Sequence, residues 1–182
     1  MLERNCAMAK LLVPPHILSR ILNHARSESP LECCGLLGGH RTTSDWQANS
    51  LHLLINELAS PTRYRSEPSS LLKALKAVRL AGEEVVAIYH SHPTSDPVPS
   101  LVDRDWHWAD DVVDLIIGLA GSTPQYRAWL LNPWPAREVL VEEWSGFRGD
   151  IGQPSHLEAD LKIRDAGEDQ IDAYKRADYP QT

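Results

Sequence analysis

Apolar residues recur along residues 10–143 in two spacings, one typical of helices and the other typical of strands. Helical spacing begins at Pro14-Pro15 and ends between residues 26 and 29, before Pro30. It returns after Ser66-Glu67-Pro68, where a second amphipathic helix is predicted. The expected inward faces consist of Ile17, Leu18, Ile21 and Leu22 in the first helix and of Leu71, Leu72, Leu75 and Val78 in the second.

Shorter apolar runs predict strands at residues 34–38, 46–57, 84–89, 112–119, 125–131 and 138–143. Within the second of these, Leu51, Leu53 and Ile55 occupy alternate positions, which is typical of a strand with one wet face. Because helices and strands alternate along the chain, the pattern predicts an α/β or α+β fold with a mixed central β-sheet flanked by helices.

The pattern changes after Trp144, where glycines and Pro154 are followed by a polar, charge-dense segment. Apolar residues are too sparse in this segment to form a core. We therefore expect one domain at residues 10–145 and a polar C-terminal tail at residues 146–182, partly disordered.

Composition and charge narrow the function classes. The 182-residue chain has a formal net charge of −7 and no cluster of Lys and Arg, which disfavours nucleic acid as a partner. No apolar run approaches the ~20 residues that a membrane span requires. The N-terminus lacks the apolar core of a signal peptide, with Met8 as an alternative start. Three cysteines, with Cys33 and Cys34 adjacent, form no disulfide framework, so we expect a cytoplasmic protein.

Two histidines follow the predicted strand 84–89, in the sequence His90-Ser91-His92-Pro93. Side chains at positions i and i+2 point to the same face of a strand, so His90 and His92 are spaced to bind one metal ion. Asp103 follows at the start of a predicted helix, where Ser100 is positioned as the N-cap. Capping alone would explain Ser100 and Asp103. Beside the two histidines, however, Asp103 completes two imidazoles and one carboxylate, the ligand set of a catalytic zinc site with one open position.

These residues resemble the signature of the JAMM/MPN+ metalloprotease family, in which His-Ser-His-Pro is followed by Ser and Asp at the spacing of Ser100 and Asp103. The family also carries an upstream segment, Pro-x-Glu-x-Cys-Gly-Leu-Leu-x-Gly, and residues 30–39 match it with PLECCGLLGG. Residues 56–64 are similar to the small bacterial and archaeal members. The resemblance covers roughly residues 12 to 143 and implies the MPN, cytidine-deaminase-like layer architecture.

The resemblance implies a zinc-dependent hydrolase of amide bonds. His90, His92 and Asp103 would hold one Zn²⁺ per chain. Glu32 would be the general acid/base that takes a proton from the attacking water and returns it to the leaving nitrogen. Ser100 would donate a hydrogen bond to the developing oxyanion.

The resemblance also implies a class of substrate. Members of the family cleave peptide or isopeptide bonds after the C-terminal Gly-Gly of ubiquitin or ubiquitin-like proteins. Few residues separate the motifs here, so the chain resembles the compact bacterial members that act on sulfur-carrier proteins. We therefore expect a ubiquitin-like or β-grasp sulfur-carrier protein as substrate and neither nucleic acid nor a membrane as partner. The oligomeric state is open, with a homodimer as one alternative.

Three neighbouring residues have weaker signals. Tyr64 lies in a predicted loop and is a candidate for lining a substrate groove. His107 stands four residues beyond Asp103, so it would face the site if the helix begun at Ser100 continues through Trp106 to Trp108. Ser91 points to the other face of its strand and is expected to be structural.

Other functions remain as alternatives. A non-catalytic MPN scaffold is the main one, although such proteins have usually lost ligands. A zinc deaminase would require His-x-Glu together with Pro-Cys-x-x-Cys, and Pro-Cys-x-x-Cys does not occur in this sequence. An iron oxygenase with two histidines and one carboxylate differs in ligand order and in fold.

Overall fold

The computed structural model of this chain describes residues 9–107 and 109–144. The predicted tail at 146–182 lies outside these residues, so its boundary and its expected disorder stay predictions. In chain order the elements are β1 (Lys10–Val13), α1 (Pro15–Glu28), β2 (Cys34–Arg41), β3 (Trp46–Leu54), α2 (Pro68–Leu80), β4 (Glu84–His92), α3 (Leu101–Asp105), β5 (Val113–Gly118), β6 (Gln125–Leu130) and β7 (Arg137–Glu143).

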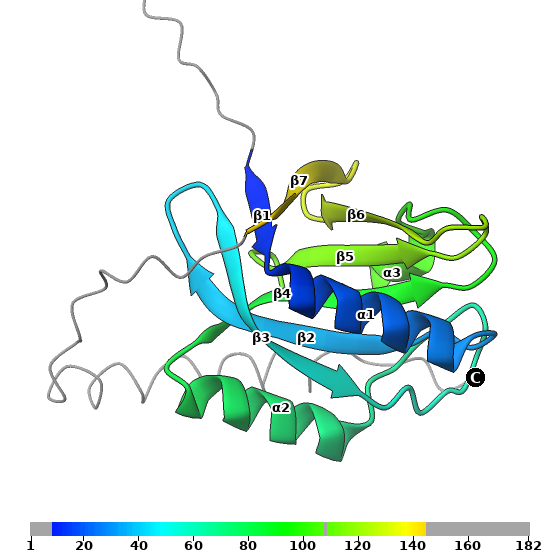
Figure 1. The fold of residues 1–182 in the computed structure, drawn as a ribbon, viewed down its shortest axis with the longest axis horizontal. Coiled ribbons are helices and arrows are strands. Elements are labelled where there is room, and N and C mark those ends of the chain that lie inside the picture. The colour runs from blue at the N-terminus through cyan, green and yellow to red at the C-terminus, as the bar shows by residue number, and fades with distance from the viewer. Residues whose placement is uncertain (1–8, 108, 145–182) are drawn as a thin grey trace, which may run out of the picture.

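The described strands form one mixed sheet that closes on itself in the order β1-β3-β2-β4-β5-β6-β7 (Figure 1). Strand β1 is parallel to both of its neighbours, β3 and β7, and β4 is parallel to β5. The remaining pairs are antiparallel. The predicted α+β fold with a mixed sheet and flanking helices is therefore confirmed. Closure of the sheet depends on β1, a four-residue strand that the sequence pattern did not predict.

The two longer helices cover opposite faces of strand β4. Ile21 of α1 belongs to the same apolar cluster as Tyr89, whereas Val78 of α2 belongs to the cluster that contains Ile88. Because consecutive strand residues point to opposite faces, α1 and α2 lie on the two sides of β4. His90 follows on the side of α2. None of the described helices is both long and apolar enough to span a bilayer.

The starts of both helices agree with the sequence prediction. Helix α1 begins with Pro15 in its first turn, where the missing N–H of proline costs no hydrogen bond. Helix α2 is capped by Glu67, whose carboxylate accepts hydrogen bonds from the backbone N–H groups of Ser69 and Ser70. The first helix ends at Glu28, within the predicted limits.

The inward faces differ from the prediction at three positions. Leu72 is 41% exposed, because the buried stripe of α2 runs through Leu71, Ala74 and Val78. In β3 the alternation is reversed at the strand end, where Leu54 is 5% exposed while Leu53 and Ile55 are 49% and 61% exposed. Leu54 packs in the cluster below α2, and this tertiary contact determines which face of the strand end is buried.

Helix α3 is shorter than predicted. It ends at Asp105, with Trp106 as its C-cap, so Trp106 and His107 do not continue the helix begun at Ser100. Trp108 lies outside the described residues. The expected orientation of His107 by helical spacing from Asp103 is therefore wrong, and its position depends on the segment that leads into β5.

Candidate metal centre

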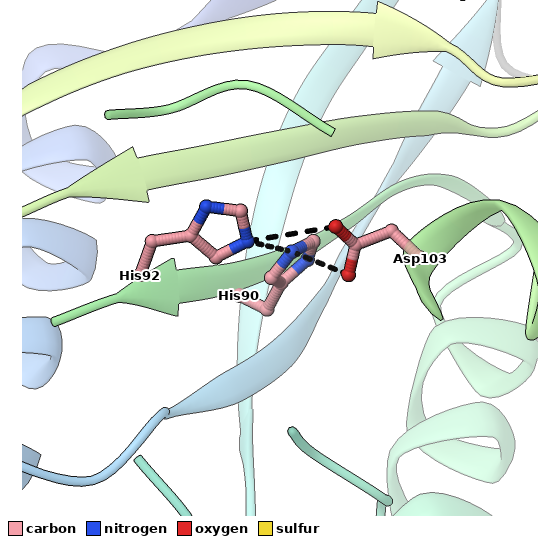
Figure 2. A group of neighbouring side chains, drawn as sticks. All are labelled: His90, His92 and Asp103. Atoms are coloured by element: carbon pink, nitrogen blue, oxygen red, sulfur yellow. Dashed lines mark hydrogen bonds and ion pairs between the residues drawn. The ribbon is translucent and has the colours of Figure 1, made fainter. Parts of the chain in front are cut away.

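Strand β4 brings His90 and His92 together on one face, as their spacing predicts. Their Nε2 atoms lie 3.2 Å apart, and both rings point toward Asp103 on α3 (Figure 2). His90 Nε2 is 3.2 Å from Asp103 Oδ1, and His92 Nε2 is 3.5 Å from Asp103 Oδ2. The three side chains come from segments of the chain that are joined by a turn, and their donor atoms converge on one point.

Asp103 has two functions in this arrangement. Its backbone N–H donates to Ser100 Oγ at 3.1 Å, and its Oδ2 accepts from the Ser100 N–H at 2.6 Å, which forms a reciprocal capping box. The predicted N-cap at Ser100 is thus confirmed. The cap fixes the carboxylate at the helix start, from which it also reaches both histidines. Capping and contact with the histidines are not alternatives here.

The donor set fits a divalent cation such as zinc. One ligand atom from each of His90, His92 and Asp103 lies within 4.8 Å of the others, and two imidazole nitrogens with a carboxylate are ligands that zinc prefers. Burial lowers the pKa of His90, but the Asp103 carboxylate outweighs it and raises that pKa overall.

Glu32 is buried beside this cluster, with 5% of its surface exposed. Burial raises its pKa to about 7, an effect that the neighbouring His90 and His92 oppose and Asp103 reinforces. Backbone hydrogen bonds of the next residue, Cys33, attach this part of the chain to β4. The Cys33 N–H donates to Ser91 Oγ at 2.9 Å, and the Ser91 N–H donates to the Cys33 carbonyl at 3.1 Å.

The predicted structural role of Ser91 agrees with these two bonds. Its side chain lies on the opposite face of β4 from His90 and His92, where it pins the residue after Glu32 to the strand that carries both histidines. A residue between the two histidines thereby bonds to Cys33, the neighbour of Glu32, across 58 positions of sequence.

Asn56 organises the loop on the other side of Glu32 and was not singled out by the sequence analysis. Its Nδ2 donates to the carbonyls of Glu32 at 2.9 Å and Arg63 at 3.1 Å. Its Oδ1 accepts from the backbone N–H groups of Leu58 at 3.1 Å and Arg65 at 3.0 Å. The available signal was the position of Asn56 at the head of segment 56–64, which resembles small bacterial family members.

Tyr64 is held in this loop and stacks on the ring of His90, with centroids 4.7 Å apart and an interplanar angle of 24°. It also packs against the apolar cluster that contains Ile88. Burial raises the pKa of its hydroxyl well above the ordinary value. The contact shows that Tyr64 buttresses a candidate ligand, and its contact with a substrate stays a prediction.

His107 and Asp114 form a second buried pair, in which Asp114 lies near the start of β5 and His107 precedes the strand. His107 Nδ1 lies 3.1 Å from Asp114 Oδ2, and the two side chains are 5% and 3% exposed. Burial lowers the pKa of His107, but the Asp114 carboxylate outweighs it and raises that pKa overall. The sequence analysis did not single out Asp114, although an acidic residue inside the apolar run 112–119 was a signal for a buried polar function.

A family model described as prokaryotic homologs of the JAB domain matches residues 14–132, the segment that contains Glu32, both histidines and Asp103. The chain belongs to this family. The resemblance to the JAMM/MPN+ metalloproteases that the two motifs showed is thereby confirmed.

Relatives of this prokaryotic JAB family member include named enzymes. A desampylase of Haloferax volcanii is 39% identical over 131 residues, which cover 69% of this chain and 81% of the relative. A probable TtuB-protein conjugate cleaving protease of Thermus thermophilus is 37% identical over 123 residues, 66% of this chain and 76% of the relative. The CysO-cysteine peptidase of Mycobacterium tuberculosis is 34% identical over 103 residues, 57% of this chain and 69% of the relative.

A solved structure supports the fold assignment. The solution structure of a protein from Desulfitobacterium hafniense aligns with a TM-score of 0.70 and 28% sequence identity, over 76% of this chain and 95% of that protein. The likeness therefore extends over almost the whole of the solved protein and about three quarters of this chain.

Proposed function

We propose that this prokaryotic JAB family member is a zinc-dependent peptidase that hydrolyses the amide bond after the C-terminal Gly-Gly of a ubiquitin-like or sulfur-carrier protein. The proposal rests above all on the buried Glu32 carboxyl group beside the converging side chains of His90, His92 and Asp103. A base next to a metal site with three protein ligands is an arrangement by which metal-dependent enzymes hydrolyse unactivated amides.

His90 and His92 would hold the zinc ion through Nε2, and Asp103 through a carboxylate oxygen. Zinc bound there supplies a Lewis acid for the scissile carbonyl and brings the pKa of a water ligand towards ~7. The capping box keeps the Asp103 carboxylate at the start of α3, and the stacked ring of Tyr64 restricts rotation of His90. The chain thereby holds its ligands in place with contacts that do not depend on the cation.

Glu32 takes the proton of the attacking water and passes it to the leaving nitrogen. General acid–base groups work best when their pKa lies near the working pH, and burial raises the pKa of Glu32 to about 7. Its backbone N–H donates to the Ser60 carbonyl at 2.9 Å, and its carbonyl accepts from Asn56. These bonds restrict the motion of a residue that has to serve both proton transfers.

Ser100 is assigned to the developing oxyanion. Its Oγ accepts the Asp103 N–H, which leaves the hydroxyl proton free to donate in another direction. The Ser100 side chain lies on the exposed side of the helix start, where a substrate can approach it. Because Ser100 caps the helix that carries Asp103, its hydroxyl is held close to a proposed metal ligand.

The substrate class is supported by the relatives. Their names describe a desampylase, a protease for conjugates of TtuB, and a peptidase for CysO-cysteine. The leaving group of the substrate is therefore proposed to be an amine that is attached to the carboxyl end of the carrier. This amine would belong to a conjugated protein, an amino acid or a peptide.

The direct test is mass spectrometry of a β-grasp carrier protein extended beyond its Gly-Gly terminus, incubated with zinc-loaded protein. We expect loss of the extension, no loss in the presence of a chelator, and no loss with Glu32→Gln protein that still contains zinc. The Glu28→Gln variant, altered at an exposed residue at the end of α1, is the matched control and should cleave as the parent does.

Two outcomes would contradict the proposal. A parent protein that binds no zinc and folds equally well in chelator would favour the non-catalytic scaffold. Cleavage that proceeds equally with Glu32→Gln would exclude Glu32 as the base.

A further inference from the structure

Asp114 and His107 are buried ionisable residues that the proposed reaction does not use. The carboxylate of Asp114 lies on β5, 3.1 Å from His107 Nδ1, and the two side chains are only 3% and 5% exposed. A buried ion pair is costly to desolvate and often stabilises a fold no more than apolar residues of the same size would. Stability alone therefore does not account for this pair, and its position relative to His90 and His92 points to a role at the metal site.

Strand register places Asp114 next to His90. Strands β4 and β5 are parallel, with Ile88 opposite Asp114 and His90 opposite Ile116. Residues in register, and residues two positions apart, share a face of the sheet, so Asp114 and His90 are diagonal neighbours on one face. Strands spaced about 4.8 Å apart, with a rise of about 3.3 Å per residue, place the two residues roughly 8 Å apart along the diagonal.

Two buried polar atoms on this diagonal lack a hydrogen-bond partner among the residues that the structure describes. They are His90 Nδ1 and Asp114 Oδ2, and both ring nitrogens of the neighbouring His107 lack a partner as well. The 3.1 Å contact between Asp114 and His107 does not have hydrogen-bond geometry, so the carboxylate oxygen retains unused acceptor capacity. One atom is a nitrogen that can carry a proton and the other is an acceptor, which makes them complementary.

The orientation of His90 decides which of its nitrogens needs this partner. Its Nε2 faces His92 and Asp103, so Nδ1 is the atom directed away from the candidate cation. A histidine that binds a cation through Nε2 carries its proton on Nδ1. Metal-binding histidines almost always donate that second N–H to a carboxylate, a carbonyl or a water, which orients the ring.

We propose that Asp114 is a positioning residue for the His90 ligand, accepting the Nδ1 proton of His90 when the metal is bound, with His107 holding the carboxylate in place. The inference rests on the metal site of the proposed function but does not depend on which substrate is cleaved.

Zinc affinity measured by competition with a chelator, without substrate, tests this inference. Asp114→Asn removes the charge while keeping the shape, and we expect it to weaken zinc binding by about 10-fold to 100-fold, the range for partners of metal ligands. The double variant His107→Gln/Asp114→Asn removes both charges together, so that no buried charge is left unpaired, and should show a loss of similar size. Cobalt-loaded protein should show an altered visible spectrum in both variants.

The matched control is Ile116→Val, on the same strand, directly opposite His90 and without a polar group. It should leave zinc affinity within about two-fold of the parent value. If the Asp114 variants bind zinc as the parent does but melt at a lower temperature in the metal-free state, the pair is merely structural and the inference is wrong. A parent protein that binds no zinc would instead overturn the proposed function itself.

Discussion

Strand β4 has two faces that differ in how their polar groups are satisfied. On the α1 side, the buried Tyr89 hydroxyl lies 2.9 Å from His24 Nδ1, and Ser91 exchanges hydrogen bonds with Cys33. On the α2 side, His90 Nδ1 is buried without a hydrogen-bond partner among the described residues, and carboxyl groups surround the ring. The first face completes its own hydrogen bonds, whereas the second leaves a buried ring nitrogen without a partner among the described residues.

The comparison shows why burial of a histidine is not by itself a functional signal. His24 and His90 both lie against the same strand, but burial lowers the pKa of His24, whereas neighbouring carboxylates raise that of His90 in spite of its burial. His24 contacts a tyrosine hydroxyl on the packed α1 face, whereas His90 lies among the carboxyl groups of the candidate metal site.

The largest expected effect comes from removing a ligand on the α2 face. Asp103→Ala should abolish zinc retention and peptidase activity, because two imidazoles remain and the carboxylate is lost. Zinc content after gel filtration is the measurement. Asp105→Ala, two residues later on the exposed part of α3, is the control, and full zinc occupancy in Asp103→Ala would contradict the ligand assignment.

Removing the proposed base should separate catalysis from metal binding. Glu32→Gln should lower kcat by about 10²-fold to 10⁴-fold, the contribution typical of general acid–base catalysis. Its zinc affinity should stay close to that of the parent, because Glu32 is not one of the proposed ligands. Retention of parental turnover in this variant would show that another group moves the proton.

Ser100 tests whether a cap also contributes to the reaction. Ser100→Ala should lower kcat by about 10²-fold to 10³-fold if the hydroxyl stabilises the oxyanion. Because it also removes the helix cap, Ser100→Asp is the necessary comparison, since an ionised Asp caps helices as well as Ser does but donates no hydrogen bond. We expect Asp to restore zinc affinity but not turnover. Complete recovery of turnover with Asp would reduce Ser100 to a capping role.

The pH dependence of the unfolding free energy should reveal the raised pKa of the buried Glu32 carboxyl group. The folded pKa of Glu32 is about 7, above its ordinary value of 4.5, so the metal-free folded protein binds more protons than the unfolded chain between these values. Stability is therefore lost as the pH rises through this window. Glu32→Gln has no carboxyl group and should not show this loss. In the metal-free state, its unfolding free energy relative to that of the parent should therefore be roughly 2 kcal/mol higher at pH 8 than at pH 5, as measured by urea unfolding. A pH-independent difference would contradict the raised pKa.

The smallest expected effect lies on the opposite face. Tyr89→Phe removes the hydroxyl next to His24 and should cost about 1 kcal/mol of unfolding free energy. Zinc affinity and turnover should not change, since this face of β4 is separate from the ligands. A loss of zinc affinity comparable to that of the Asp114 variants would show that the two faces are coupled.

Much of the fold could be predicted because its signals are local. Both long helices start at the expected prolines, and β4 ends at His92 as Pro93 requires. The closing strand β1 was missed, because four residues carry too little periodicity to be recognised. The length of α3 was overestimated, because the cap at Ser100 marks where a helix begins and contains no information about where it ends.

The candidate site divides in the same way. The i, i+2 spacing of His90 and His92 on a strand, and the cap that fixes Asp103 at the start of a helix, follow from the sequence alone, because backbone geometry determines both. Sequence could not show that Ser91 bonds to Cys33, the neighbour of Glu32, or that Asp114 lies diagonally opposite His90. Those relations depend on strand pairing between distant segments, which only the tertiary structure determines.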